Sequence, residues 1–242
     1  MFDRRIVAIH SVNDRTFSVR RLVWYIRVMK FLGYRFVSID DILKKECPRK
    51  AVALTVDDAY KSCMGNLIPI LEKYHIPALM FVPVGLLGLP ANHPNLLKYE
   101  CYKDEATMCA DDVNVWLNKG FDIGFHTMKH IDLYSQTNLE YIQEDFKKGM
   151  DIMRENGWDT DYFAYPKGFL PKDRAHFESL LRQQGIKYAF TINWGTVSTD
   201  KPFYINRVCL GNHEYMFWAI LKSLGILDFY FKKKRMSKAQ VI

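Results

Sequence analysis

Several sequence signals are missing or scarce in this chain of 242 residues. No apolar run reaches the roughly 18–20 uninterrupted residues that a membrane-spanning helix needs. The first twelve residues lack the long apolar stretch and small-residue cleavage site of a secretory signal. The five cysteines are odd in number, far apart and never arranged as C-x-x-C. We therefore expect a cytoplasmic protein with reduced thiols, and neither a disulfide framework nor a zinc knuckle.

Internal repeats, low-complexity segments and interdomain linkers are also lacking. Hydrophobic residues make up 49% of the chain and charged residues 25%, which is the balance of a globular protein. A chain of this length can bury a sizeable core. We predict a single domain over residues 1–210, followed by a C-terminal segment, 211–242, with an apolar helix and a basic tail.

The net charge is +7, from 34 basic and 27 acidic residues, with much of the excess near the two ends. A basic chain can meet nucleic acid, an anionic membrane or an acidic substrate. No nucleic-acid-binding motif accompanies the charge, so we expect no nucleic-acid partner.

Strand and helix patterns alternate along the chain. Short apolar segments predict strands at 6–12, 34–39, 51–56, 76–84, 121–126, 162–166, 188–192 and 205–210. Helical periodicity separates most of them, at 18–33, 65–75, 111–120, 138–157 and 175–185. This order predicts an α/β fold whose parallel sheet closes as a barrel of about seven units. In such barrels the site lies at the carboxyl ends of the strands. Residues 85–106 form the one long insertion, which could serve as a lid or rim.

Two adjacent aspartates, Asp57 and Asp58, follow the buried strand 51–56. Aspartate is common in loops, and Asp58 could cap a helix that begins near Ala59. Placing two like charges side by side is nevertheless unfavourable unless a cation offsets their repulsion. The residues here leave both explanations open.

His126 and His130 follow the strand 121–126 and are four residues apart. If one helical turn follows the strand, both imidazoles face the same side and could bind one metal ion. One carboxylate would complete a site of two histidines and one carboxylate, with open positions for water and substrate. A second carboxylate could then take a proton as general base.

Three segments, LTVDDAY (54–60), IGFHTMKHIDL (123–133) and FAYPKG (163–168), resemble the first three motifs of the polysaccharide deacetylases. These are the family-4 carbohydrate esterases with a NodB-homology domain. The resemblance covers residues 51–208 well and 1–50 more loosely. It implies a distorted (β/α)7-type barrel and a hydrolase that removes an N-acetyl group from an amino sugar or polysaccharide, in glycan or cell-envelope synthesis.

The resemblance also implies roles for individual residues. Asp57 matches the general base. Asp58, His126 and His130 match the ligands of a divalent metal, usually Zn²⁺, and Thr127 matches the residue that steadies the histidines. Backbone N–H groups near Lys167 and Gly168 match the oxyanion site. Substrate contacts are expected from Tyr165, Pro166, Trp194 and His10.

The sequence departs from the family pattern at several positions. Ala59 replaces a glycine, Ala164 replaces the arginine that orients the base, and Lys167 replaces an aromatic residue. The subset that acts on poly-N-acetylglucosamine also lacks this arginine, and DDAYKS and FAYP resemble that subset most. The catalytic histidine of the fifth motif has His213 as its nearest candidate and His10 as another.

Two alternative functions stay open. A related barrel could hydrolyse another C–N amide, or the departures could mark a carbohydrate-binding protein without catalysis. Residues 215–235 either close the barrel as a terminal helix or lie peripherally on the anionic inner face of a membrane. Neither the identity of the sugar nor the oligomeric state follows from the sequence.

Overall fold

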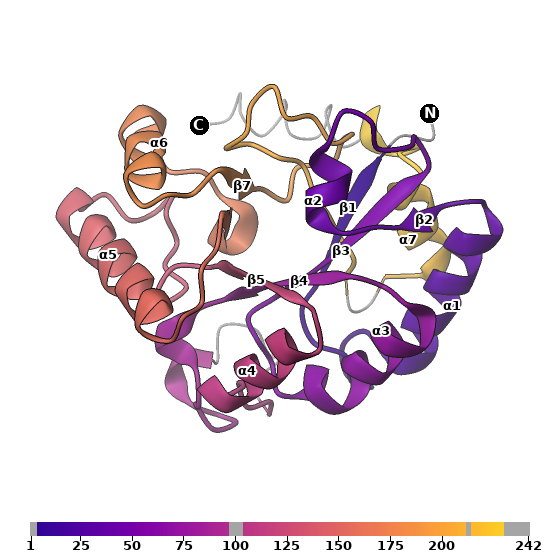
Figure 1. The fold of residues 1–242 in the computed structure, drawn as a ribbon, viewed down its shortest axis with the longest axis horizontal. Helices are drawn as coiled ribbons and strands as arrows, with labels where there is room; N and C mark the ends of the chain where they lie inside the picture. The colour runs from indigo at the N-terminus through magenta and orange to yellow at the C-terminus, as the bar shows by residue number, and fades with distance from the viewer. Residues whose placement is uncertain (1–3, 97–103, 212–213, 230–242) are drawn as a thin grey trace.

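The computed structural model describes residues 4–96, 104–211 and 214–229 (Figure 1). Its strands are β1 (Arg5–Ile9), β2 (Arg35–Phe36), β3 (Ala51–Asp57), β4 (Ala78–Val82), β5 (Asp122–Phe125), β6 (Tyr162–Ala164), β7 (Tyr188–Phe190) and β8 (Val208–Cys209). Its α-helices are α1 (Val19–Phe31), α2 (Ile39–Leu43), α3 (Ile68–Tyr74), α4 (Ala110–Asn118), α5 (Leu139–Glu155), α6 (Arg174–Gln183) and α7 (Met216–Ser223). Short π- or 3₁₀-helical turns cover Cys63–Leu67, Val84–Leu86, Pro94–Leu96 and Pro166–Gly168.

The strands form one parallel sheet in the order β7-β6-β5-β4-β3-β1-β8, with β2 paired to the start of β3. The sheet curls into a distorted half-barrel. Among the described residues no ladder joins β7 to β8, so the barrel is not closed. Helices α1, α3, α4, α5 and α6 surround its outer face (Figure 1). The predicted α/β barrel class is confirmed.

The direction of the β3 side chains places the first aspartate inside the barrel. Ala51 and Ala53 belong to a small core cluster inside the curled sheet, together with Phe81. The intervening residues of β3 pack into the larger cluster beneath the helices. Because side chains alternate along a strand, Asp57 points to the same interior as Ala51 and Ala53. The sheet thus delivers a carboxylate to the carboxyl end of the barrel.

The segment 34–39 differs from its predicted strand. Only Arg35 and Phe36 pair with β3, and helix α2 begins at Ile39. The Ser38 hydroxyl caps this helix by accepting a hydrogen bond from the Asp41 N–H at 3.0 Å. Ile39 and the other apolar residues of α2 pack into the interior cluster, so the helix helps to fill the barrel.

The C-terminal segment packs on the outside of the barrel, against α1. The Tyr25 hydroxyl donates to Ser223 Oγ of α7 at 2.8 Å, and Arg5 pairs with Asp228 at 2.7 Å. The predicted division at residue 210 stays a prediction. Within the described ranges, no helix has both the length and the apolar character needed to cross a bilayer.

Candidate active site

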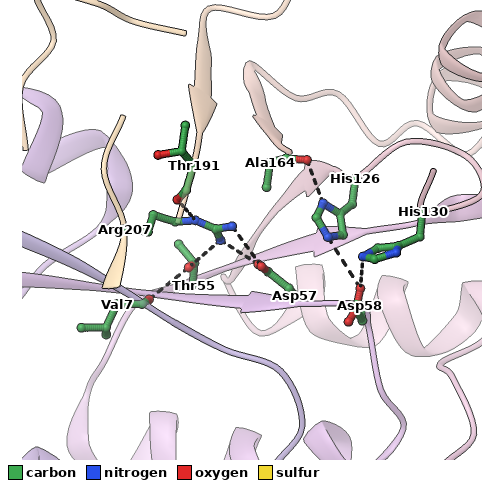
Figure 2. A network of polar contacts seen from close by, with 9 residues as sticks. All are labelled: Val7, Thr55, Asp57, Asp58, His126, His130, Ala164, Thr191 and Arg207. Atoms are coloured by element: carbon green, nitrogen blue, oxygen red, sulfur yellow. Dashed lines mark hydrogen bonds and ion pairs between the residues drawn. The ribbon is translucent and has the colours of Figure 1, made fainter. Parts of the chain in front are cut away.

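The Asp57 carboxylate is buried and held by an arginine from a distant part of the chain. Arg207, one residue before β8, donates Nη1 to Asp57 Oδ1 at 2.7 Å and Nη2 to Asp57 Oδ2 at 2.9 Å (Figure 2). This is a two-point contact that fixes the plane of the carboxylate. Ala164 stands where the family motif has its arginine, so Arg207 supplies the orientation that Ala164 cannot.

The Arg207 guanidinium is itself fully buried and fixed by further contacts. Its Nε donates to the Thr191 carbonyl at 3.2 Å, and its Nη1 also donates to Thr55 Oγ1 at 3.0 Å. Thr55 in turn donates its hydroxyl proton to the Val7 carbonyl at 3.0 Å. Burial alone would raise the pKa of Asp57, but Arg207 and then His126 lower it to about 2. Asp57 is therefore ionised at neutral pH.

The second aspartate faces two histidines. Asp58 Oδ1 lies 3.6 Å from His126 Nε2 and 3.3 Å from His130 Nε2 (Figure 2). One ligand atom from each of these three residues lies within 4.8 Å of the other two, and all three residues are buried. The arrangement fits a divalent cation bound by two imidazoles and one carboxylate.

The protonation of His126 suits this use. His126 Nδ1 lies 2.8 Å from the Ala164 carbonyl, which can only accept a proton. Nδ1 is therefore the N–H, and Nε2 presents its lone pair toward Asp58 and His130. Burial, and then the neighbouring His130, lower the pKa of His126 to about 4. The imidazole is thus neutral at pH 7, as metal binding requires.

The two histidines are brought together by a tight loop rather than by one helical turn. Residues 126–130 are not helical, and Thr127 and His130 have positive φ angles of 60° and 52°. Asp145 of α5 is buried and accepts the Met128 N–H at 2.9 Å and the Lys129 N–H at 3.1 Å. Thr127 Oγ1 accepts the Ile131 N–H at 3.1 Å. Side chains rather than helical hydrogen bonds therefore hold this loop.

Lys167 and Gly168 lie in a strained turn after β6. Both have left-handed φ angles, 57° and 67°. A Cβ on Gly168 would lie 2.0 Å from Ile192, so the turn tolerates only glycine there. The Lys167 ammonium points to Asp132, with Nζ 3.1 Å from Oδ2. The lysine side chain is therefore engaged by Asp132, and only its backbone is left for the predicted oxyanion role.

Strained backbone is concentrated around these residues. Seven non-glycine residues of the described chain have positive φ, and five belong to the candidate site: Asp58, Ala59, Thr127, His130 and Lys167. Such conformations persist where the surrounding structure enforces them, and they cluster at functional sites. The φ of 50° at Ala59 also explains why a glycine would suit that position.

The predicted substrate-binding residues have different environments. Tyr165 is 1% exposed, donates its hydroxyl to the Phe203 carbonyl at 3.1 Å and packs in the core beneath the helices. Pro166 is buried as well. Trp194 is half-buried, with the Lys222 ammonium of α7 5.0 Å from its ring centroid.

Of the two candidate histidines for the fifth motif, only His10 lies within the described residues. His10 follows β1, whose register with β3 places it beside Asp57. Burial would lower the pKa of His10, but a hydrogen bond with Cys209 and the Asp58 and Asp57 carboxylates raise it to about 9. His213 lies outside the described residues.

A cavity of about 450 Å³ opens beside His130. Its polar lining includes Lys129, His130, Asp132, Gln136, Tyr141 and Lys167. This volume lies within the range of about 300–1,000 Å³ that is typical of small-ligand pockets. The site therefore has room for a substrate next to His130.

Sequence reasoning missed Arg207 and Asp145. A charged residue inside the apolar segment 205–210 was a signal, because a buried arginine needs a carboxylate partner. Asp145 gave no such signal, since acidic residues on an amphipathic helix are usually exposed.

Comparisons with known proteins agree with this geometry. Residues 44–189 match the polysaccharide deacetylase family. The poly-beta-1,6-N-acetyl-D-glucosamine N-deacetylase of Staphylococcus epidermidis is 24% identical over 214 residues, covering 85% of this chain and 70% of the relative. The corresponding enzyme of Staphylococcus aureus strain MRSA252 is 24% identical over 224 residues, with the same coverage.

Two solved structures share the fold. IcaB from Ammonifex degensii superposes with a TM-score of 0.74 at 23% identity, covering 93% of this chain and 97% of that one. The Streptococcus pyogenes deacetylase PplD, in complex with acetate, gives a TM-score of 0.71 at 20% identity, covering 91% and 98%. The family match spans more than half of the chain and includes Asp57, Asp58 and both histidines. The protein therefore belongs to the polysaccharide deacetylase family and is a carbohydrate N-deacetylase with a candidate metal site.

Proposed function

We propose that this chain removes acetyl groups from a polymer of N-acetylglucosamine, with Asp57 as the general base and Asp58 as a metal ligand. The relatives named above act on poly-β-1,6-N-acetylglucosamine. The cavity beside His130 would hold a sugar unit of the polymer. The observation that carries the proposal is the pairing of Asp57 with Arg207 next to the cluster of Asp58, His126 and His130.

Asp58, His126 and His130 would hold the divalent cation, for which we propose zinc. When bound, the cation polarises the acetamide carbonyl and lowers the pKa of a bound water toward about 7. Two imidazoles and one carboxylate would leave coordination positions open for both.

Asp57 would act as the base. It is ionised, both of its oxygens are fixed by Arg207, and it is the last residue of β3, directly before Asp58. Its low pKa keeps the carboxylate ionised at neutral pH, so it is available to accept a proton from the attacking water. The Lys167 backbone N–H would donate to the carbonyl oxygen as negative charge develops there, whereas the Gly168 N–H donates to the Tyr165 carbonyl at 2.8 Å.

The departing amine needs a proton. His10 would supply it, since its strand register places it beside Asp57. His213 is the alternative acid. Trp194 would contact the sugar at the edge of the site, held by Lys222. A cytoplasmic location, which follows from the cysteine pattern, stays a prediction.

The test is product analysis with zinc-loaded protein and β-1,6-linked N-acetylglucosamine oligomers, with free N-acetylglucosamine for comparison. We expect acetate release that is faster from oligomers than from the free sugar. Ammonia without acetate would indicate hydrolysis of another amide. Oligomer binding without any product would indicate a non-catalytic carbohydrate-binding protein, and either result would overturn the proposal.

A further inference from the structure

Large exposed hydrophobic side chains are concentrated on one side of the molecule. Twelve are exposed in the described ranges, and eight of them lie on α1 or in residues 215–229: Val19, Trp24, Phe31, Tyr215, Phe217, Trp218, Ile226 and Phe229. Phe31 is 90% exposed, Phe229 81% and Phe217 65%. A cluster of this kind on a soluble domain marks an interaction surface.

Helices α1 and α7, which carry most of these residues, pack against each other (Figure 1). Arg21 of α1 donates Nε to the Met216 sulfur at 3.3 Å, and Tyr25 donates to Ser223 at 2.8 Å. We call the outward side of α1 and of residues 215–229 the α1–α7 face.

The outer side of α1 combines cations with aromatic rings. Its exposed residues Arg20, Trp24, Arg27 and Phe31 are spaced four, three and four residues apart, so they share one side of the helix. The opposite side carries the buried residues Leu22, Tyr25, Ile26 and Met29. This side of α1 therefore offers both aromatic rings and positive charge to a partner surface.

The charge of the α1–α7 face has one sign. Neither α1 nor α7 contains an aspartate or glutamate. The acidic residues that flank α7 are paired with buried cations: Glu214 lies 2.6 Å from Lys222, and Asp228 lies 2.7 Å from Arg5. Beyond Phe229 the sequence adds four consecutive basic residues, 232–235. The face therefore complements an anionic surface.

We propose that the α1–α7 face docks on an anionic phospholipid bilayer. Trp24, Phe217 and Trp218 enter the head-group region, and Arg20 and Arg27 contact lipid phosphates. A second copy of the chain is a poorer occupant, since two basic faces would repel each other. The aromatic residues supply apolar contact and the arginines supply the preference for anionic lipid.

Docking in this way would hold the candidate active site near the bilayer. Lys222 of α7 contacts the Trp194 ring and donates to the Cys209 carbonyl at 2.8 Å. The helix that carries part of the docking face therefore also supports the edge of the site. The docking proposal does not depend on the identity of the sugar.

The experiment is flotation of the full-length protein with vesicles of phosphatidylglycerol and phosphatidylcholine, or of phosphatidylcholine alone. Binding should require the anionic lipid and should fall between about 0.1 M and about 1 M salt, where the Debye length drops from about 10 Å to about 3 Å. Absence of binding to anionic vesicles at low salt, or equal binding to both kinds of vesicle, would overturn the proposal.

Two variants test the assigned residues. Trp24→Ser combined with Phe217→Ser should reduce the fraction floated at least fivefold. Arg20→Ser should lower the partition coefficient about fivefold, which is the effect of one basic residue near an anionic surface. The matched control is Val115→Ser with Leu139→Ser, which removes exposed apolar side chains from α4 and α5.

Sedimentation and deacetylase activity on a soluble oligomer show whether each variant is folded. Equal loss of binding in the control pair, or unchanged binding in the Trp24 and Phe217 variant, would contradict the assignment. If the parent protein is a dimer and the Trp24 and Phe217 variant is a monomer, the α1–α7 face binds a second copy of the chain. That result would also overturn the proposal.

Discussion

Arg207 and Asp57 form an ion pair in the barrel interior with almost no access to solvent. Removing two charges from water is costly, and such pairs seldom increase stability over an apolar pair of the same volume. The benefit here is geometric, because two hydrogen bonds fix the carboxylate beside the candidate metal ligands. Phe81 adds a contact, with its ring centroid 5.0 Å from the guanidinium carbon.

Replacing Arg207 by methionine should be strongly destabilising. Asp57 would remain buried without its cation, so burial would dominate and raise the pKa of its carboxyl. We expect the free energy of unfolding at pH 7 to fall by about 3–5 kcal/mol, measured by denaturant titration. The control Arg49→Met, at an exposed position, should change it by less than about 0.5 kcal/mol. Equal stability of the Arg207 variant and the parent would show that the pair contributes nothing to the fold.

The metal-free protein should lose stability in mild acid because of His126. Its pKa is about 4 in the folded chain and near 6.5 when unfolded, so between these values the unfolded chain binds more protons. The stability that neutral His126 contributes is complete above pH 6.5 and is lost as the pH falls toward 4. Urea titrations of chelator-treated protein across this range should show that the free energy of unfolding rises with pH. His126→Gln should reduce the slope of this dependence. An identical slope in both proteins would assign it to other groups.

At the scale of elements, the loop 126–130 depends on helix α5. Asp145 accepts hydrogen bonds from two loop N–H groups, and Thr127 accepts one from the N–H of Ile131, directly after the loop. These contacts hold His130 in a left-handed conformation that it would otherwise seldom adopt. The distance between the two imidazoles is therefore set by residues that do not touch the cation.

Asp145→Ala should weaken metal binding without removing a ligand. Loss of such a supporting contact typically costs about 10–100-fold in affinity, because the ligands are no longer held in place. Competition with a chromophoric chelator would measure the change. The matched control is Glu144→Ala, the neighbouring exposed residue on α5, whose carboxylate pairs with Lys148. If both variants bind the metal equally well, the loop does not need Asp145.

At the scale of the whole molecule, the alternation of strands and helices was enough to predict the curled parallel sheet. The two aspartates and two histidines were predictable because each pair directly follows a buried strand. Arg207 was not identified, since it is 150 residues from Asp57 and meets it only when β8 pairs with β1. Helix α2 was missed because its five residues are too few to show a helical period. The loop geometry of 126–130 depends on Asp145 and could not be predicted from spacing.

The central claim is that two neighbouring aspartates have different tasks, Asp58 binding the cation and Asp57 acting as the base. The most direct measurement is the metal content of Asp57→Asn and Asp58→Asn after identical zinc loading and desalting, with acetate release assayed on the same samples. We predict that Asp57→Asn keeps about one zinc per chain, as one cluster of ligands implies, while kcat falls by at least ~10²-fold. Asp58→Asn should lose both the zinc and the activity. An Asp57→Asn protein without zinc, or an Asp58→Asn protein that retains it, would contradict the account.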